Sequence, residues 1–310
     1  MRSLVFRTEE LKRLHALNIC DVKHLCCHLG TTPKELERIC SAPEKYYRKE
    51  ERNFEGKMRS LSIPRKPLLE IQKRLNRLLQ RIIVPENIHG GLRGHSHITN
   101  AMLHSRKPMV VANDLKDFFP SINYKKVYGV FSKRLGCKPD IARYLTKLTT
   151  IDGSLPQGSP TSTILSALVA EPLTNRLNGL SKKHGSTYTQ YVDDITFSGP
   201  VHVARLNPLL ERIIKQEGFK PNPSKRKVMG IDQEQVVTGI KVNQGADVPG
   251  MKVKEVRKLI DGLEIQQRSG QKLSEDEVAS IKGKIQYIIQ LNRGAGLHLR
   301  RRLDRVLNQR

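Results

Sequence analysis

The sequence predicts an α+β protein, with a sheet that carries helices on one face and a helical segment at the C-terminal end. In residues 187–198, TYTQYVDDITFS, two runs of β-branched and aromatic residues flank a pair of acids, which is typical of strand, turn and strand. Residues 108–114, PMVVAND, form a short apolar run that ends in an acid, as a buried strand would. Helical patterns before, between and after these strands complete the α+β order.

Composition indicates a polyanionic partner. The 310 residues contain 55 Lys and Arg against 30 Asp and Glu, a net charge of +25 that is spread along the chain. A basic protein of the membrane surface is the rival interpretation. We find no run of 18 apolar residues and no signal-peptide pattern, so we expect a soluble, cytoplasmic protein without a membrane partner.

The cysteines indicate a reducing compartment, because their number is odd and their spacing does not resemble a disulfide framework. Several lie close in sequence to His15, His24 and His28, which raises a zinc hypothesis. No CxxC pair is present, so buried thiols on helices are favoured over a zinc site. The five residues are Cys20, Cys26, Cys27, Cys40 and Cys137.

The first 107 residues are predicted to contain helices and one hairpin. Residues 1–45 show three short helical patterns, which fit either a plain helical cap or a DNA-binding helix-turn-helix. Residues 46–63 are very basic and read as a hairpin around Gly56, and residues 64–83 read as an amphipathic helix. The glycine-rich loop that opens residues 90–104 suits a backbone close to phosphates and leads into a short helix.

The remaining elements alternate between loops, helices and one more strand. A turn at residues 116–121 is expected to open a helix that lasts to about Leu135. We expect further helices at 163–180 and 203–217, a strand near 236–242, and about three helical segments in 252–310, split near Gly270 and at 294–296.

Three acids carry the predicted chemistry. Asp114 ends one predicted strand, and Asp193 and Asp194 lie at the turn between two others. If these strands are neighbours, the site offers only hard oxygen ligands, which selects Mg²⁺ over zinc. Two such ions, roughly 3.5–4 Å apart, activate a hydroxyl nucleophile and stabilise a leaving pyrophosphate. On a basic protein this pattern predicts nucleotidyl transfer.

Five motifs resemble those of a known family. NDLKDFF (113–119), LPQGSPTS (155–162) and YVDD (191–194) resemble motifs A, B and C of reverse transcriptases, in the same order. NAMLH (100–104) and VTG (237–239) are similar to the NAxxH and VTG motifs of the retron subgroup. The resemblance extends over roughly two thirds of the chain, and the two ends match only in general character.

The resemblance implies a right-hand polymerase fold with fingers, a ferredoxin-like palm (an antiparallel sheet backed by helices) and a helical thumb. The implied boundaries are a helical segment at 1–45, fingers at 46–107, and a palm at 108–245 that includes part of the fingers around 130–155. The basic helical thumb would occupy 246–310.

The resemblance also implies roles at the acidic cluster. Asp114 and Asp193 would be the main ligands of two Mg²⁺ ions, with Asp194 completing the cluster and the peptide oxygen of Leu115 adding a contact. Lys225 aligns with the motif D lysine and would donate a proton to pyrophosphate. Two prolines in 219–223 leave open whether Lys225 or Lys227 points inward.

Further residues are assigned to the nucleotide and to nucleic acid. The ring of Phe119 falls where it would exclude a ribose 2′-OH, and Val192 would support the template strand. The expected dNTP-binding residues are Lys57, Arg59, Asp117, Phe118, Phe119, Gln157 and Gly158. The expected nucleic-acid-binding residues are Arg93, Asn100, His104, Val237, Thr238, Gly239, Arg300, Arg301, Arg302 and Arg305.

The implied function is that of a retron RNA-directed DNA polymerase. Its partners would be a cognate structured non-coding RNA, which is both template and primer, dNTPs, the DNA product and a separate effector protein. Synthesis from an RNA 2′-OH would yield RNA-linked single-stranded DNA (msDNA) in anti-phage defence. The alternatives are another bacterial reverse transcriptase (group II intron-like, diversity-generating or abortive-infection type), or a non-catalytic basic RNA-binding scaffold.

Overall fold

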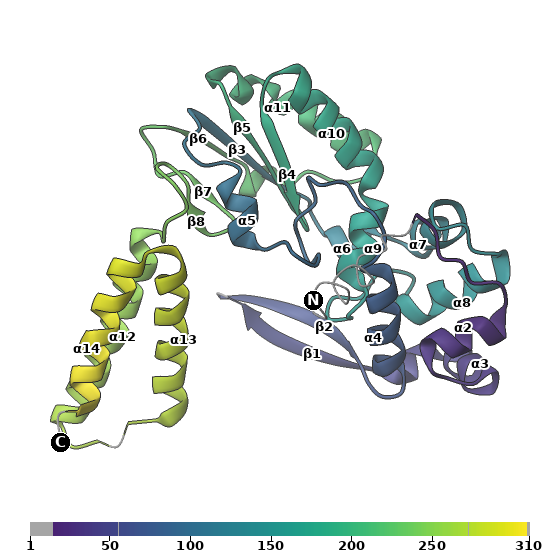
Figure 1. Cartoon of the computed structure of the whole chain (residues 1–310), viewed down its shortest axis with the longest axis horizontal. Helices are drawn as coiled ribbons and strands as arrows, with labels where there is room; N and C mark the ends of the chain where they lie inside the picture. Colours follow the sequence, from purple (N-terminus) through teal and green to yellow (C-terminus); the bar gives the residue numbers. More distant parts are fainter. Residues whose placement is uncertain (1–14, 55, 272, 309–310) are drawn as a thin grey trace, which may run out of the picture.

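The centre of the molecule is a four-stranded antiparallel sheet (Figure 1). The computed structural model describes residues 15–54, 56–271 and 273–308, without the side chains of Phe54 and Lys57. The strands lie in the order β4-β5-β3-β6. Their bounds are Met109–Asp114 (β3), Thr187–Tyr191 (β4), Asp194–Gly199 (β5) and Lys227–Gly230 (β6). The three strands predicted from the motifs are therefore confirmed, whereas the short edge strand β6 was not predicted.

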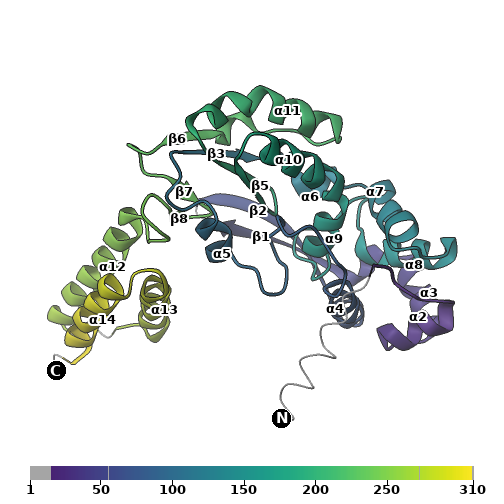
Figure 2. The ribbon, with the colours of Figure 1, turned by 45° about the horizontal axis from the view of Figure 1, so that its top comes forward.

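Helices α10 (Glu171–Lys183) and α11 (Asn207–Gln216) lie together on one face of this sheet (Figure 2). Their buried leucines and isoleucines join the same hydrophobic core as Tyr188 and Phe197 of the strands. The single helix expected at 163–180 is instead two helices. The first, α9 (Ser162–Val169), ends just before α10, which has Pro172 in its first turn, where proline is favoured.

The N-terminal half packs against the same core. Helices α2 (Val22–Leu29) and α3 (Pro33–Ser41) lie against α4 (Leu68–Leu79) and α8 (Pro139–Thr149). The side chains of Asp21 and Thr32 accept hydrogen bonds from the first turns of α2 and α3 and so fix where those helices begin. The first expected helical pattern lies mostly outside the described residues.

A long hairpin of β1 (Tyr47–Phe54) and β2 (Lys57–Pro64) extends from the α4 side toward the C-terminal helices (Figure 1). It confirms the hairpin expected at 46–63. Elsewhere the expectations were less accurate, because the helix expected after 116–121 is broken and the strand expected near 236–242 is a small separate hairpin. These elements are α5 (His97–Met102), α6 (Phe118–Ser121), α7 (Tyr124–Gly129), a π-helical turn (Val130–Arg134), β7 (Val236–Val237) and β8 (Ile240–Lys241). Three 3₁₀ turns span Pro43–Tyr46, Val201–Leu206 and Pro223–Lys225.

The last three helices form a body with its own core, which we call the C-terminal bundle (Figure 1). They are α12 (Gly250–Arg268), α13 (Glu275–Leu291) and α14 (Arg293–Asn308). Three helical segments were expected, and the second break falls at Asn292, slightly earlier than predicted. Among the residues that the structure describes, no helix is both long and apolar enough to cross a lipid bilayer.

Candidate active site

The turn between β4 and β5, residues 191–194, is held in a strained conformation. We call it the acidic turn. Val192 has a φ of 58°, in the left-handed region that β-branched residues rarely adopt. The side-chain amide of Gln190 donates a hydrogen bond of 2.9 Å to the Val192 carbonyl oxygen and supports this geometry. Strain of this kind is typical of functional sites.

The three predicted acids lie at the same end of the sheet. Asp114 is the cross-strand partner of Asp194 in the ladder of β3 and β5. One residue further on, the Leu115 amide donates a hydrogen bond of 2.9 Å to the Asp193 carbonyl oxygen. The sheet register therefore gathers carboxylates that are about 80 positions apart in the sequence.

This cluster is short of positive charge. Burial raises the pKa of Asp194 to about 7, and repulsion from Asp193 and Asp114 adds to the effect. Burial and repulsion from Asp114 also raise the pKa of Asp193, although Lys225 and Arg59 oppose the shift. A bound cation would remove this cost.

Lys225 is the motif D lysine that reaches the acids. Its ammonium forms an ion pair with one carboxylate oxygen of Asp114, and the side-chain amide of Asn222 donates a 2.9 Å hydrogen bond to the other. Lys227 instead lies on β6 opposite Ala112. Of the two lysines, Lys225 is therefore the one that pairs with Asp114, whereas Lys227 only adds a weaker attraction that acts on Asp194.

The three carboxylates are suitable ligands for a divalent metal, but they are not arranged as a complete coordination site. Three clustered carboxylates are the ligands that hard cations prefer. In the described part of the chain, however, no group of three or more His, Cys, Asp or Glu side chains is poised to hold a metal ion. Both oxygens of Asp114 are engaged by Lys225 and Asn222, so a cation at Asp114 would have to displace the lysine.

The loop at residues 155–162 is fastened to the β1–β2 hairpin. The Ser62 amide donates a 2.7 Å hydrogen bond to the Gln157 carbonyl oxygen. Gly158 has a φ of 108°, and a Cβ on it would come within 3.3 Å of the Ser62 carbonyl oxygen, so a glycine is favoured at this close approach to β2. The Ser159 hydroxyl donates a 2.8 Å hydrogen bond to the side-chain oxygen of the buried Gln72, which anchors the loop to α4.

The residues expected to bind a nucleotide fall into different environments. Arg59 on β2 is exposed and close enough to oppose the rise in the pKa of Asp193. Asp117 is also exposed, at a φ of 50°. The side chain of Lys57 lies outside the described residues.

For Phe118 the structure argues against a contact through the side chain. Its ring is buried in the core against Phe219, with centroids 5.6 Å apart, so the ring is not available to a nucleotide. Phe119 is half-buried at the edge of the same aromatic group, 5.7 Å from Phe118, so its ring is the more accessible of the two.

The retron-like motifs also require a correction. Asn100, His104 and Val237 were expected to bind nucleic acid, but all three side chains are buried. The two ring nitrogens of His104 lie 2.7 Å from the hydroxyls of Ser198 and Thr189, so the ring links β5 to β4. Burial lowers the pKa of His104 to about 3, which keeps this ring neutral.

The glycine-rich loop contains a residue whose role the sequence did not reveal. A Cβ on Gly90 would overlap the backbone nitrogen and the Cγ2 atom of Val192, so this loop packs on the acidic turn itself. The glycines of this loop indicated a close backbone approach, but the sequence did not show that Val192 is the residue approached. Arg93 of the same loop is exposed, and its amide donates a 3.1 Å hydrogen bond to the side chain of Gln80.

The arginines of α14 are not equivalent. Arg300, Arg301 and Arg305 are exposed. Arg302 is turned toward α12, where it forms ion pairs with Asp261 at 2.5 Å and Glu264 at 3.5 Å. Its expected role in nucleic-acid binding is therefore not supported, because its charge is already neutralised.

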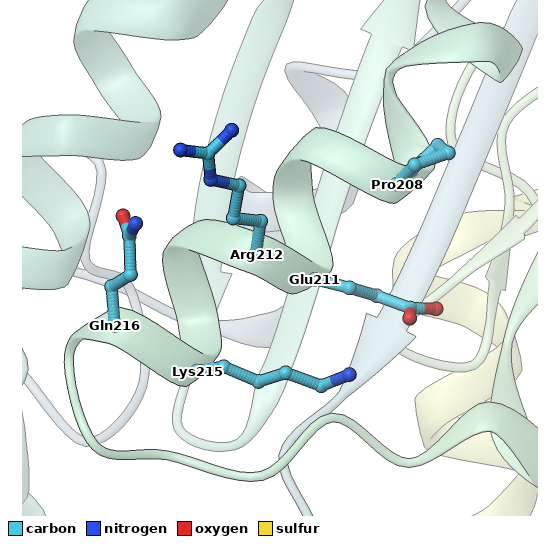
Figure 3. Close-up of a pocket in the computed structure, with 5 residues that line it drawn as sticks. All are labelled: Pro208, Glu211, Arg212, Lys215 and Gln216. Atoms are coloured by element: carbon cyan, nitrogen blue, oxygen red, sulfur yellow. The ribbon is translucent and has the colours of Figure 1, made fainter.

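Two other groups of polar residues lie away from the acids. On the surface of α2, the Nε2 atoms of His24 and His28 lie 2.9 Å apart. All five cysteines are free thiols. A hollow on the outer side of α11 is lined by Arg212, Lys215 and Gln216 together with two further residues (Figure 3). Its only acid, Glu211, forms an ion pair with Arg226 at 3.0 Å. Neither group contributes to the acidic cluster.

Comparison with known proteins identifies the class. Residues 47–259 match the reverse transcriptase (RNA-dependent DNA polymerase) family. This is more than half of the chain, and the chain belongs to that family.

The relatives narrow the class to the retron type. The chain is 33% identical to the retron Mx162 reverse transcriptase of Myxococcus xanthus, over 64% of this chain and 47% of that protein. It is 30% identical to the retron Ec86 reverse transcriptase of Escherichia coli, over 79% of this chain and 76% of that protein. The chain spans about half the length of its two Myxococcus relatives. A telomerase structure from Candida albicans aligns with a TM-score of 0.45 and 10% identity, over 84% of this chain and 63% of that chain.

Proposed function

We propose that this chain is an active RNA-directed DNA polymerase of the retron type. The observation that carries the proposal is the meeting of Asp114 with the acidic turn at one end of the sheet, in a chain of the reverse transcriptase family. A non-catalytic scaffold would have no use for partly buried carboxylates whose pKa values are raised by desolvation and by their mutual repulsion.

The acids act as the metal site. Asp114 and Asp193 are the main ligands, Asp194 completes the cluster, and the Leu115 carbonyl oxygen adds a contact. Two Mg²⁺ ions, when bound, would activate the primer hydroxyl and stabilise the leaving pyrophosphate. Lys225, once released from Asp114, is placed to donate a proton to that leaving group.

The hairpin and the loop fastened to it form the nucleotide side of the site. Arg59 and Lys57 bind the triphosphate, a task that suits a guanidinium because it can form two parallel hydrogen bonds. Gln157, Gly158 and the exposed Asp117 border the incoming nucleotide. The ring of Phe119 excludes a ribose 2′-OH and so selects deoxynucleotides.

The regions take the parts of a right-hand polymerase. Residues 46–107 serve as fingers, residues 108–245 as palm and residues 246–310 as thumb, behind an N-terminal helical segment. The exposed arginines of α14 hold the duplex by its backbone, which is how proteins recognise A-form helices. Arg93, Thr238 and Gly239 contact nucleic acid on the side of the palm.

The template and primer are parts of one structured non-coding RNA. Synthesis starts from a 2′-OH of that RNA in the cytoplasm and yields RNA-linked single-stranded DNA. With a separate effector protein, the complex serves in anti-phage defence. The retron relatives and the net charge of +25 support this assignment.

The test is the Asp193→Asn variant, compared with wild type on the RNA that copurifies when the chain is expressed with its flanking DNA. We expect loss of dNTP incorporation by at least about 1000-fold, because a lost metal ligand removes several kcal/mol of transition-state stabilisation. RNA affinity should stay within about twofold, since the binding surface is intact.

Asp232→Asn is the matched control, because Asp232 is an exposed acid away from the cluster. It should leave activity unchanged. Full incorporation by the Asp193→Asn variant would overturn the metal assignment. Sequencing of the product must show DNA joined to RNA, and a product without that branch would overturn the retron assignment.

A further inference from the structure

We propose that helix α5, the Val237–Gly239 turn, Tyr287 and Lys252 form a joint that sets the position of the C-terminal bundle relative to the acidic turn. His97 and Tyr287 are the positioning residues of this joint. The inference rests on the proposed function, in which the bundle holds the template–primer duplex. It also gives the buried side chains of Asn100, His104 and Val237 a role that does not require contact with RNA.

The joint is built around one pair of rings. His97 of α5 stacks on Tyr287 of α13, with ring centroids 5.6 Å apart and planes inclined by 17°, and its Nε2 atom lies 3.3 Å from the tyrosine hydroxyl. The Lys252 ammonium of α12 lies 5.3 Å from the centre of the Tyr287 ring, within the range of a cation–π contact. Burial and the nearby Lys252 lower the pKa of His97, which favours the neutral ring.

The Val237–Gly239 turn adjoins both partners. The Thr238 hydroxyl donates a 2.9 Å hydrogen bond to the His97 carbonyl oxygen and accepts a 3.5 Å one from the Asn100 amide. Gly239 has a φ of 78°, and a Cβ on it would lie 3.4 Å from the Lys252 ammonium. A larger residue at Gly239 would therefore be strained by its positive φ and would touch the Lys252 side chain.

The other end of the α5 segment is tied to the strands of the acidic turn. His104, just beyond α5, bridges Ser198 of β5 and Thr189 of β4 through its two ring nitrogens. The start of α5 is fixed by a capping box between Ser96 and Thr99. A single short segment, 96–104, therefore contacts the bundle at one end and the catalytic strands at the other.

Among the residues that the structure describes, few other contacts hold the bundle in place. Its buried residues form a core separate from that of the sheet. Beyond the ring pair, the Asn292 amide donates a 3.0 Å hydrogen bond to Asp247, and Leu291 packs against the small cluster beneath β7 and β8. Because each body has its own core, loss of the ring stack should move the bundle and leave both bodies folded.

The first test separates binding from chemistry. In His97→Ala and Tyr287→Leu variants, we expect the KM for template–primer to rise about 5–10-fold, as loss of an aromatic contact would allow. Products should be shorter, while kcat for the first nucleotide at saturating duplex stays within about twofold. Tyr287→Phe keeps the ring, so its KM and product length should equal those of the wild type. A fall in kcat with unchanged KM would overturn the positioning role.

The second test does not depend on polymerase activity. Spin labels are placed on Val201→Cys and Ile265→Cys in the full chain, at sites that are 66% and 69% exposed, after the exposed Cys20 and Cys27 are replaced by serine. We expect the distance distribution between the labels to shift or broaden in the His97→Ala variant.

The matched control is His28→Ala, which breaks a ring pair on the surface of α2. It should leave the distances unchanged, as should Tyr287→Phe. An unchanged distribution in His97→Ala would overturn the joint. An inactive wild type would overturn the proposed function instead, and the distance measurement would still decide whether the joint exists.

Discussion

The sheet and the C-terminal bundle are built in opposite ways. The acids of the sheet are placed by a ladder of six consecutive residue pairs between β3 and β5, over a core that runs from Leu17 to Phe219. The bundle has its own small core, and in the described part of the chain it touches the rest through a ring stack, polar contacts and the apolar packing of Leu291. The clustered acids therefore lie on the body with the larger continuous core, and the exposed arginines lie on the separately packed bundle.

The two bodies also differ in how their charges are compensated. In the sheet, the carboxylates of Asp193 and Asp194 are partly buried, and their pKa values are raised by desolvation and by repulsion between neighbouring acids. In the bundle, the positive charges of Arg300, Arg301 and Arg305 are exposed. We infer that the carboxylates of the sheet suit a compact cation, whereas the exposed arginines of the bundle suit an extended polyanion.

The largest effect on the sheet should come from Gly90→Ala. The new methyl group would overlap the backbone of Val192, so the acidic turn must shift. We expect kcat to fall about 10–100-fold with little change in RNA affinity, because a displacement of about 1 Å at a reacting group is costly. Steady-state kinetics check this.

Gly179→Ala is the control, since a Cβ there meets no atom within 4 Å. It should be neutral or slightly stabilising, as alanine is the better helix former. Equal losses in the two variants would mean that Gly90 has no special relation to the acidic turn.

A smaller and different effect should follow from the triple variant Arg300→Ala, Arg301→Ala and Arg305→Ala. We expect RNA affinity to fall about tenfold and the salt dependence of binding to weaken by about one unit for each lost phosphate contact. The turnover at saturating RNA should stay near wild type. Binding measured at several salt concentrations tests this.

Arg302→Ala in the same helix is the comparison. Because Asp261 and Glu264 already neutralise this guanidinium, it should change RNA affinity less than any one of the other three substitutions. A larger loss of affinity than theirs would show that Arg302 leaves α12 when RNA binds.

The smallest effect is on stability, in Asp194→Asn with EDTA present. The pKa of Asp194 is raised to about 7, so the folded chain holds this proton more tightly than the unfolded chain does. Its contribution to the free energy of unfolding therefore falls as pH rises from about 4 to about 7, and the full cost is present above that window. The variant removes this cost, so Tm should rise by a few degrees at pH 8 and less at pH 5. A larger rise in Tm at pH 5 than at pH 8 would contradict the raised pKa of Asp194.

The sequence alone determined the local features. The strand patterns around Asp114 and the acidic turn, the β1–β2 hairpin and the three helices of the bundle depend on residues that are neighbours in the chain. Their side-chain periods and turn residues specify them without help from the rest of the fold. The family motifs were visible for the same reason, since each is a short, uninterrupted string.

Only the tertiary structure decided which distant residues meet. It selected Lys225 over Lys227 at Asp114, placed Gly90 on Val192, buried Phe118, Asn100 and His104, and set Arg302 against α12. Each outcome depends on strand register and on which core side chains fill a given space, and both arise from contacts between segments far apart in the chain. A linear pattern specifies the chemistry that a residue can perform, but the packing of the whole chain selects its partner.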